Sequence, residues 1–329
     1  TLQFAYKKED KQTHSFPIEV AEGTSSTIKC PSHGTLKSVI SGTGDLTLEI
    51  PYLRYYVNSS FADFDGQLYI KGIPMSGENV LFMNESKFNS PNLRVNLSDK
   101  TWMGAWTTNA DNVVGGISGE KGSYLVGSSK NTKNFKCSWT VGGANSDETF
   151  HGIINDWATS GKSYTGTTSI IKVGTGLWRL NGDNTYSGAT SINEGTLIVN
   201  GNNSGKGAMT VADGATLKGK GSVKGKITVN GGGTLCPGDE GVDGSHLTAK
   251  GGLALNSGSK LVIPVAEGED GAIILNGISV AGTISVADGA GLEIDLSRIS
   301  NHQFKRGDTL PVIKDAANIT SGAGSFTIY

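Results

Sequence analysis

Short runs of alternating hydrophobic and polar residues recur along the chain, and each is broken by a glycine-containing turn. The stretch MTVADGATL (209–217) returns in altered form as ITVNGGGTL (227–235), LALNSGSKL (253–261) and ISVADGAGL (284–292). Alternation with a period of two is typical of a β-strand with one buried face. A helix is excluded because glycine and β-branched residues fill these runs. Each copy therefore predicts two short strands joined by a tight corner.

The aliphatic residues at matching positions of the copies are predicted to point inward. In the first copy these are Met209, Val211 and Leu217, and Gly214 stands where the corner needs a positive φ. The later copies keep aliphatic residues at the same places, namely Ile227, Val229, Leu235, Leu253, Leu255, Leu261, Ile284, Val286 and Leu292. A unit this short cannot bury its own hydrophobic face, so the copies must stack on one another.

The spacing of the copies decides how they stack. Ile192, Val211 and Val229 are separated by 19 and 18 residues, and the longer steps to Leu255 and Val286 indicate inserted loops. A β-propeller blade would need about 40–45 residues, and a leucine-rich repeat would need a signature that the chain lacks. We therefore predict an all-β chain folded as a parallel β-helix, with short strands and about 18–20 residues per coil.

The distribution of aromatic residues divides the chain. Phe, Tyr and Trp are absent from residues 187–303, and all five tryptophans precede this stretch. Weaker alternating runs such as GTGDLTLEI (42–50) occur in the first half. We predict aromatic-rich coils with longer loops at 1–186, regular glycine-rich coils at 187–298 and a C-terminal cover at 299–329. A separate β-sandwich over the first of these regions is the alternative.

Charge and cysteine content exclude several kinds of partner and cofactor. The net charge is −2, which indicates neither a nucleic acid nor an anionic membrane as partner. Cys30, Cys137 and Cys236 are widely separated, so they predict neither a closed disulfide framework nor a metal site. The sequence contains no signal peptide and no membrane span, and its start at Thr1 is expected of a mature form or an excised piece. We expect no cofactor, no metal and no direct membrane insertion of this chain.

Three segments of the stretch 170–239 carry a family pattern. They are Gly-Thr-Gly-Leu-x-x-Leu-x-Gly at 174–182, Asn-Thr-Tyr-Ser-Gly-x-Thr at 184–190 and Gly-Thr-Leu-x-Val at 195–199. The stretch resembles the autotransporter-associated β-strand repeat of bacterial surface proteins. This resemblance implies a right-handed parallel β-helix that is secreted or displayed on the outer surface of a Gram-negative-type bacterium. The repeat itself names no catalytic residue.

The sequence offers no catalytic constellation. Its five histidines are isolated, no serine stands in a Gly-x-Ser-x-Gly elbow, and the acids are scattered, whereas glycoside hydrolysis needs a pair. We therefore predict a non-catalytic, exported or cell-surface scaffold or adhesin-like segment that contacts surface or host glycans or proteins. The alternative is a polysaccharide lyase or hydrolase, or an accessory domain of one, because many β-helix proteins have these activities.

Two aromatic-rich segments are the candidate carbohydrate-binding sites. TWMGAW contains Trp102 and Trp106, and YLRYY contains Tyr52, Arg54 and Tyr55. Exposed aromatic faces stack on sugar rings. The alternative is that these residues fill the wider N-terminal coils or a cap.

Overall fold

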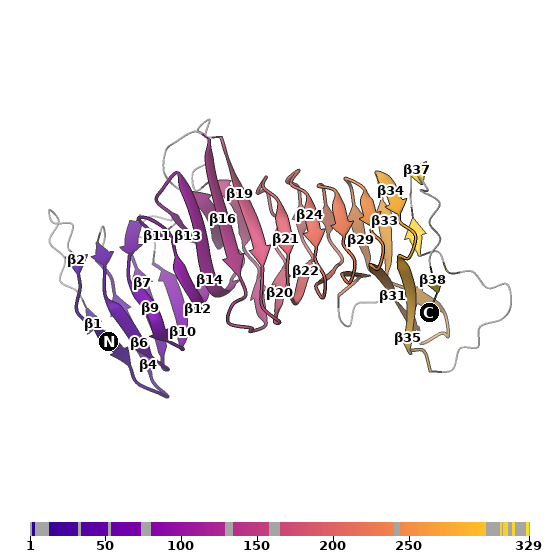
Figure 1. The fold of residues 1–329 in the computed structure, drawn as a ribbon. Coiled ribbons are helices and arrows are strands. Elements are labelled where there is room, and N and C mark those ends of the chain that lie inside the picture. Colours follow the sequence, from indigo (N-terminus) through magenta and orange to yellow (C-terminus); the bar gives the residue numbers. More distant parts are fainter. Residues whose placement is uncertain are drawn as a thin grey trace. The chain divides into compact units, whose positions relative to one another are not determined.

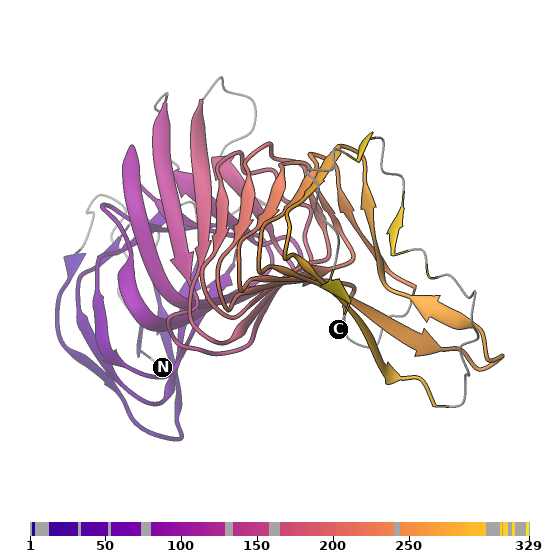
Figure 2. The same cartoon turned by 45° about the vertical axis from the view of Figure 1, so that its right-hand side comes forward.

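The protein is an all-β chain in two compact units, residues 1–187 and 188–329. The predicted all-β class is confirmed, because the described residues form strands and turns and contain no helix. No helix that could cross a membrane is found in this part of the chain. The computed structural model (Figures 1 and 2) describes residues 2–3, 13–31, 34–51, 54–73, 80–128, 134–157, 165–239, 244–300, 310, 312–314, 318–319 and 327–328.

The strands of the first unit form three ladders. The first ladder contains β1 (Leu2–Gln3), β4 (Ser25–Lys29), β7 (Asp45–Ile50), β10 (Gln67–Gly72), β12 (Asn89–Leu97), β14 (Asn109–Gly119), β17 (Glu148–Phe150) and β20 (Leu177–Leu180). The second contains β2 (Thr13–His14), β5 (Thr35–Leu36), β8 (Arg54–Val57), β11 (Val80–Asn84), β13 (Thr101–Ala105), β15 (Tyr124–Ser128) and β18 (Ile153–Trp157). β3 (Ile18–Val20), β6 (Val39–Gly42) and β9 (Ser60–Phe64) form the third ladder, which is a separate sheet. β16 (Phe135–Val141) and β19 (Gly166–Lys172) belong to the same sheet as the first ladder, and β16 pairs with the beginning of β14 and with β19.

Within a ladder, each strand pairs in parallel with the corresponding strand one turn of the chain further on. We call each such turn a rung. Leu46, Leu68 and Val95 are in register on successive rungs, so neighbouring rungs here are 22 and 27 residues apart. A β-sandwich is built from antiparallel sheets. Every strand pairing of the described residues in this unit is parallel, as the side-by-side strands β14, β16 and β19 show in Figures 1 and 2.

The core of the first unit contains large aromatic side chains as well as aliphatic ones. Trp139 and Trp178 are completely buried, and each indole N–H donates to a backbone carbonyl, that of Val126 at 3.0 Å and that of Ile117 at 2.8 Å. Such partners remove the cost of burying the polar end of the ring. Rungs of 22 to 31 residues enclose these side chains, whereas the rungs of 18 to 20 residues at the start of the second unit contain no aromatic residue.

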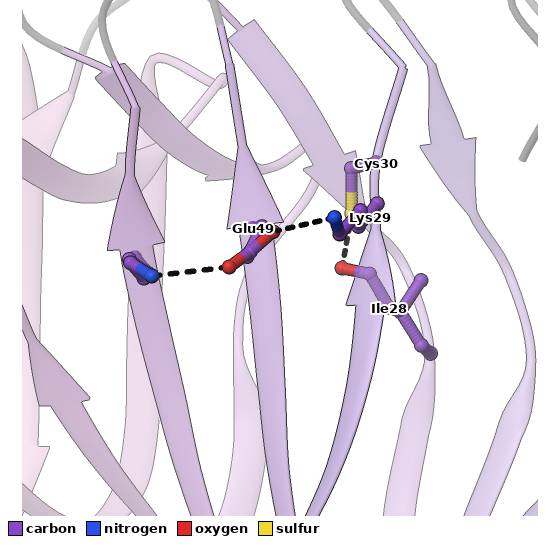
Figure 3. A network of polar contacts seen from close by, with 5 residues as sticks. Ile28, Lys29, Cys30 and Glu49 are labelled. Carbon is purple, nitrogen blue, oxygen red and sulfur yellow. Dashed lines mark hydrogen bonds and ion pairs between the residues drawn. The ribbon is translucent and has the colours of Figure 1, made fainter. Parts of the chain in front are cut away.

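Outward-facing charges also follow the ladders (Figure 3). Glu49 lies between two lysines of the neighbouring rungs, with 3.1 Å from its Oε1 to Lys71 Nζ and 4.0 Å from its Oε2 to Lys29 Nζ. Both lysines are about half exposed, so each pair contributes less than about 1 kcal/mol. This row of charges keeps the outer face of the first ladder hydrated, and the stacked interior carries the stability.

The three thiols are free and buried. Burial raises the pKa of Cys30, which is shown in Figure 3, to about 12 and that of Cys137 to about 11, and it also raises the pKa of Cys236. Because only the thiolate is nucleophilic, we expect iodoacetamide at pH 8 to label all three at least about a hundredfold more slowly in the native protein than in urea. Mass spectrometry of the alkylated chain measures this, and one cysteine labelled equally fast in both states would contradict it.

The strands of the second unit also form three ladders. The first contains β22 (Thr196–Val199), β25 (Thr216–Gly219), β28 (Thr234–Pro237), β31 (Lys260–Glu267), β35 (Gly291–Arg298) and β38 (Thr327–Ile328). The second contains β23 (Asn202–Asn203), β26 (Ser222–Val223), β29 (His246–Ala249), β33 (Gly277–Val280) and β36 (Ile313–Lys314). The third contains β21 (Thr190–Ile192), β24 (Met209–Val211), β27 (Ile227–Val229), β30 (Leu253–Leu255), β34 (Thr283–Val286) and β37 (Asn318–Ile319).

The nine-residue repeats form this stack with the predicted alignment. Val211 pairs with Val229, Val229 with Leu255 and Leu255 with Val286, each in parallel register. The inward positions of the repeats are buried, apart from Val286, which is half-buried. The corner glycines all have positive φ, as predicted for Gly214: 71° there, 78° at Gly232, 77° at Gly258 and 82° at Gly289.

One hairpin interrupts the parallel pairing of the second unit. β32 (Ile273–Leu275) pairs antiparallel with the end of β31, within the 31-residue step between Leu255 and Val286. The insertion expected from that spacing is therefore an extra strand. Most of the predicted C-terminal cover at 299–329 lies outside the described residues.

Candidate functional site

Two of the predicted carbohydrate-binding residues lie in the interior of the first unit. Tyr55 in β8 is completely buried. Trp102 in β13 is 8% exposed and stacks on Tyr124 of the next rung, with ring centroids 4.2 Å apart and planes inclined by 24°. A sugar ring stacks on an exposed aromatic face, and neither side chain presents one here.

The other three predicted residues have different positions. Tyr52 lies outside the described residues, and Arg54 is the first residue of β8. Trp106, which follows β13, is half-buried and makes an edge-to-face contact with Tyr56 at 6.3 Å. Trp106 therefore keeps part of its surface exposed.

A polar groove includes Thr107, the residue after Trp106, and lies at the corner that follows the strands of the second ladder. Two adjoining cavities of about 560 and 280 Å³ share Ser86 and Lys87, and together we call them the corner groove. Its lining residues are Asn58, Ser59, Ser60, Phe61, Asn84, Ser86, Lys87, Phe88, Asn89, Ser90, Thr107, Asn109, Ala110, Asp111 and Lys136. Amide, hydroxyl and ammonium groups dominate this lining, and such groups hydrogen-bond to sugar hydroxyls.

Hydrogen bonds between rungs fix one side of the groove. The buried Asn84 donates from Nδ2 to the carbonyl of Val57 at 3.0 Å and accepts from the backbone N–H of Ser86 at 2.9 Å. The backbone N–H of Trp106 donates to the carbonyl of Asn84 at 2.7 Å. Three successive rungs are joined at this point, so the backbone of Trp106 is fixed next to Thr107, which lines the groove.

A second buried asparagine fixes the deeper part of the groove. Asn112 is completely buried in β14 and accepts the backbone N–H of Phe88 at 3.1 Å. Its Nδ2 donates to the carbonyl of Ser138 on the following rung at 3.1 Å. The segment that carries Phe88 and its neighbours is thereby tied to two further rungs.

None of the residues that line the groove was predicted from the sequence. A signal was present, because polar triplets such as Asn58-Ser-Ser60, Asn84-Glu-Ser86 and Thr107-Thr-Asn109 follow successive strands of the second ladder. The alternation of single strands does not reveal which of these corners stack, and the register of the ladders supplies that information.

A second cavity, of about 610 Å³, lies at the corner between the first and second ladders. Tyr124 and Ile153 form its apolar wall, and Asp99, Lys121, His151 and Asp183 are among the exposed groups around it. Asn181 Nδ2 lies 3.2 Å from His151 Nδ1. In the described part of the chain no group of three or more His, Cys, Asp or Glu side chains could hold a metal ion.

Comparison with known proteins places a repeat within this fold. Residues 170–199 match the model of the passenger-associated-transport-repeat. The chain carries an autotransporter-associated repeat. Over 96 residues it is also 38% identical to the adhesin BmaC autotransporter of Brucella suis biovar 1 (strain 1330), an alignment that spans 28% of this chain and 3% of that protein. The chain therefore covers only a small part of its relative's length.

Residues of the repeat have visible structural roles. Trp178 and Leu180 in β20 are buried in the core of the first unit. The buried Lys172 donates from Nζ to the carbonyls of Val173 and Gly174, at 2.8 Å each. Asn184 accepts the backbone N–H of Ile154 on the preceding rung at 2.8 Å. These contacts stabilise the stacking of rungs, so this part of the repeat specifies structure.

Proposed function

We propose that this chain is a non-catalytic, exported and adhesin-like passenger segment, secreted by or displayed on the surface of a bacterium. In this proposal its two units are right-handed parallel β-helices, and the corner groove of the first unit contacts glycans of a surface or host. The observation that carries the glycan assignment is the corner groove itself, a polar channel crossing several rungs, whose lining residue Thr107 directly follows the half-buried Trp106.

Several findings support the architecture in this proposal. In-register parallel ladders with inward aliphatic rows are typical of a parallel β-helix. The repeat at 170–199 and the relative's name, which describes an autotransporter and an adhesin, support export and attachment. A rigid stack also suits attachment, because groups on successive rungs keep a fixed spacing of about 4.8 Å.

Substitution of Trp106 tests the glycan contact. If its ring packs against bound sugar, we expect Trp106→Ala to weaken oligosaccharide binding by about five- to tenfold, as the loss of one aromatic stacking contact. Glycan-array screening of the full chain followed by calorimetry on the best ligand gives the affinities. Tyr69→Ala is the control, because Tyr69 is 38% exposed on β10 of the first ladder and does not line the groove. Absence of glycan binding, or an equal loss in both variants, would overturn the proposal.

A further inference from the structure

We propose that the corner groove selects glycans that carry anionic groups, carboxylate or sulfate, through Lys87 and Lys136. This inference rests on the proposed function, which places a glycan in the groove, and it adds the chemical class of that glycan. The two lysines line the larger cavity together with Asp111, and both are exposed.

The carboxylates at the groove are already engaged by donors of the protein. Asp111 accepts a hydrogen bond from the Ser138 hydroxyl at 2.8 Å. Glu85, beside the groove, accepts from Asn58 Nδ2 at 2.7 Å, and Asn58 Oδ1 accepts the backbone N–H of Glu85 at 3.0 Å. Each acid therefore satisfies part of its hydrogen-bonding capacity within the protein.

The ammonium groups of Lys87 and Lys136 have no such partner among the described residues. Glu49 forms ion pairs with Lys29 and Lys71 in this part of the chain, and neither Lys87 nor Lys136 takes part in one. The chain as a whole has a net charge of −2, so its overall charge does not attract anions. Any attraction of an anion to the groove therefore comes from these two lysines. A cation without a protein partner is available for a charge-assisted hydrogen bond to a ligand anion.

The positions of the two lysines favour a linear ligand with repeated charges. Asn89 is in register with Val113, and Asn109 is in register with Lys136. Lys87 therefore lies two rungs from Lys136, a separation of about 10 Å along the stacking direction at the usual spacing of strands. A linear glycan lying along the stacking direction can present successive acidic sugars to both lysines, while the amides and hydroxyls of the groove bind its neutral hydroxyls.

Calorimetry with the full chain tests the inference through three ligands of equal length: an oligogalacturonate, a sulfated galacto-oligosaccharide and the uncharged galacto-oligosaccharide. We expect at least one anionic ligand to bind about tenfold more tightly than the neutral one, and the two anionic arms distinguish carboxylate from sulfate. We expect K87Q/K136Q to reduce that affinity to the neutral level. Raising the salt concentration should remove the same advantage, because exposed charges are screened.

The matched control removes two lysines elsewhere. Lys220 and Lys224 are exposed in the second unit, and K220Q/K224Q changes the net charge equally. A loss of affinity as large in this control would overturn the inference. Equal binding of neutral and anionic ligands that depends on Trp106 would overturn the charge selection and leave the proposed function standing. Absence of binding by all three ligands would overturn both.

Discussion

Gly219→Ala is expected to destabilise the second unit by about 3–5 kcal/mol, although it adds a single methyl group. Gly219 ends β25 with φ of 131°, a conformation that L-residues rarely adopt. A Cβ at this position would overlap the carbonyl oxygen of Val199 on the preceding rung. The residue also exchanges two backbone hydrogen bonds with Gly238, of 2.9 and 2.8 Å, which hold it close to both neighbours. The methyl group can be accommodated only if the rungs move apart.

Gly214→Ala is the matched control for this prediction. Gly214 also has a positive φ, of 71°, but no atom lies within 4 Å of the place where its Cβ would stand. The control therefore adds backbone strain alone, at about 1–2 kcal/mol. Urea unfolding followed by far-UV circular dichroism measures both free energies. Equal losses of unfolding free energy in the two variants would show that the positive φ, and not the closeness of the rungs, makes glycine necessary at position 219.

The stacking of the second unit could be predicted from sequence because two independent patterns agree there. The alternation places Val211 and Val229 on an inward face. Their separation of 18 residues predicts that they lie at equivalent positions of successive rungs, and they pair in register. Longer insertions leave that register intact, since Leu255 continues the row. The row is covered less completely at its end, because β34 pairs with β37 through Thr283 and Ile284 in the described part and Val286 is half-buried.

The candidate site was harder to predict because burial of an aromatic ring depends on the next rung. Alternation within β8 places Tyr55 inward with Val57, and both are buried. Alternation cannot account for Trp102, since every residue of β13 is buried and the stack with Tyr124 covers its ring. Trp106 is only half-buried, because it follows the strand, at a corner. Because the rungs differ in length, the sequence alone does not show which residues of neighbouring rungs lie side by side.

Asn112→Leu is expected to destabilise the first unit by about 2–4 kcal/mol and to weaken glycan binding at the same time. Leucine has nearly the shape of asparagine but neither donor nor acceptor. The substitution would leave the N–H of Phe88 and the carbonyl of Ser138 without the 3.1 Å hydrogen bonds that each now makes to Asn112. Losing a partner costs about 1–3 kcal/mol for each buried group. Urea unfolding followed by tryptophan fluorescence measures the effect in the correct unit, because all five tryptophans precede residue 187.

The control is Asn96→Leu on a neighbouring strand. Asn96 is half-buried, and its Nδ2 donates to the Ser118 hydroxyl at 2.9 Å, a group that can rotate toward another partner. We expect this variant to lose less than about 1 kcal/mol and to bind glycans normally. The binding comparison separates two roles of Asn112, because Phe88 lines the corner groove and its backbone is held by the Asn112 amide. If Asn112→Leu lowered stability but bound glycan with unchanged affinity, the amide would hold the rungs together without shaping the groove.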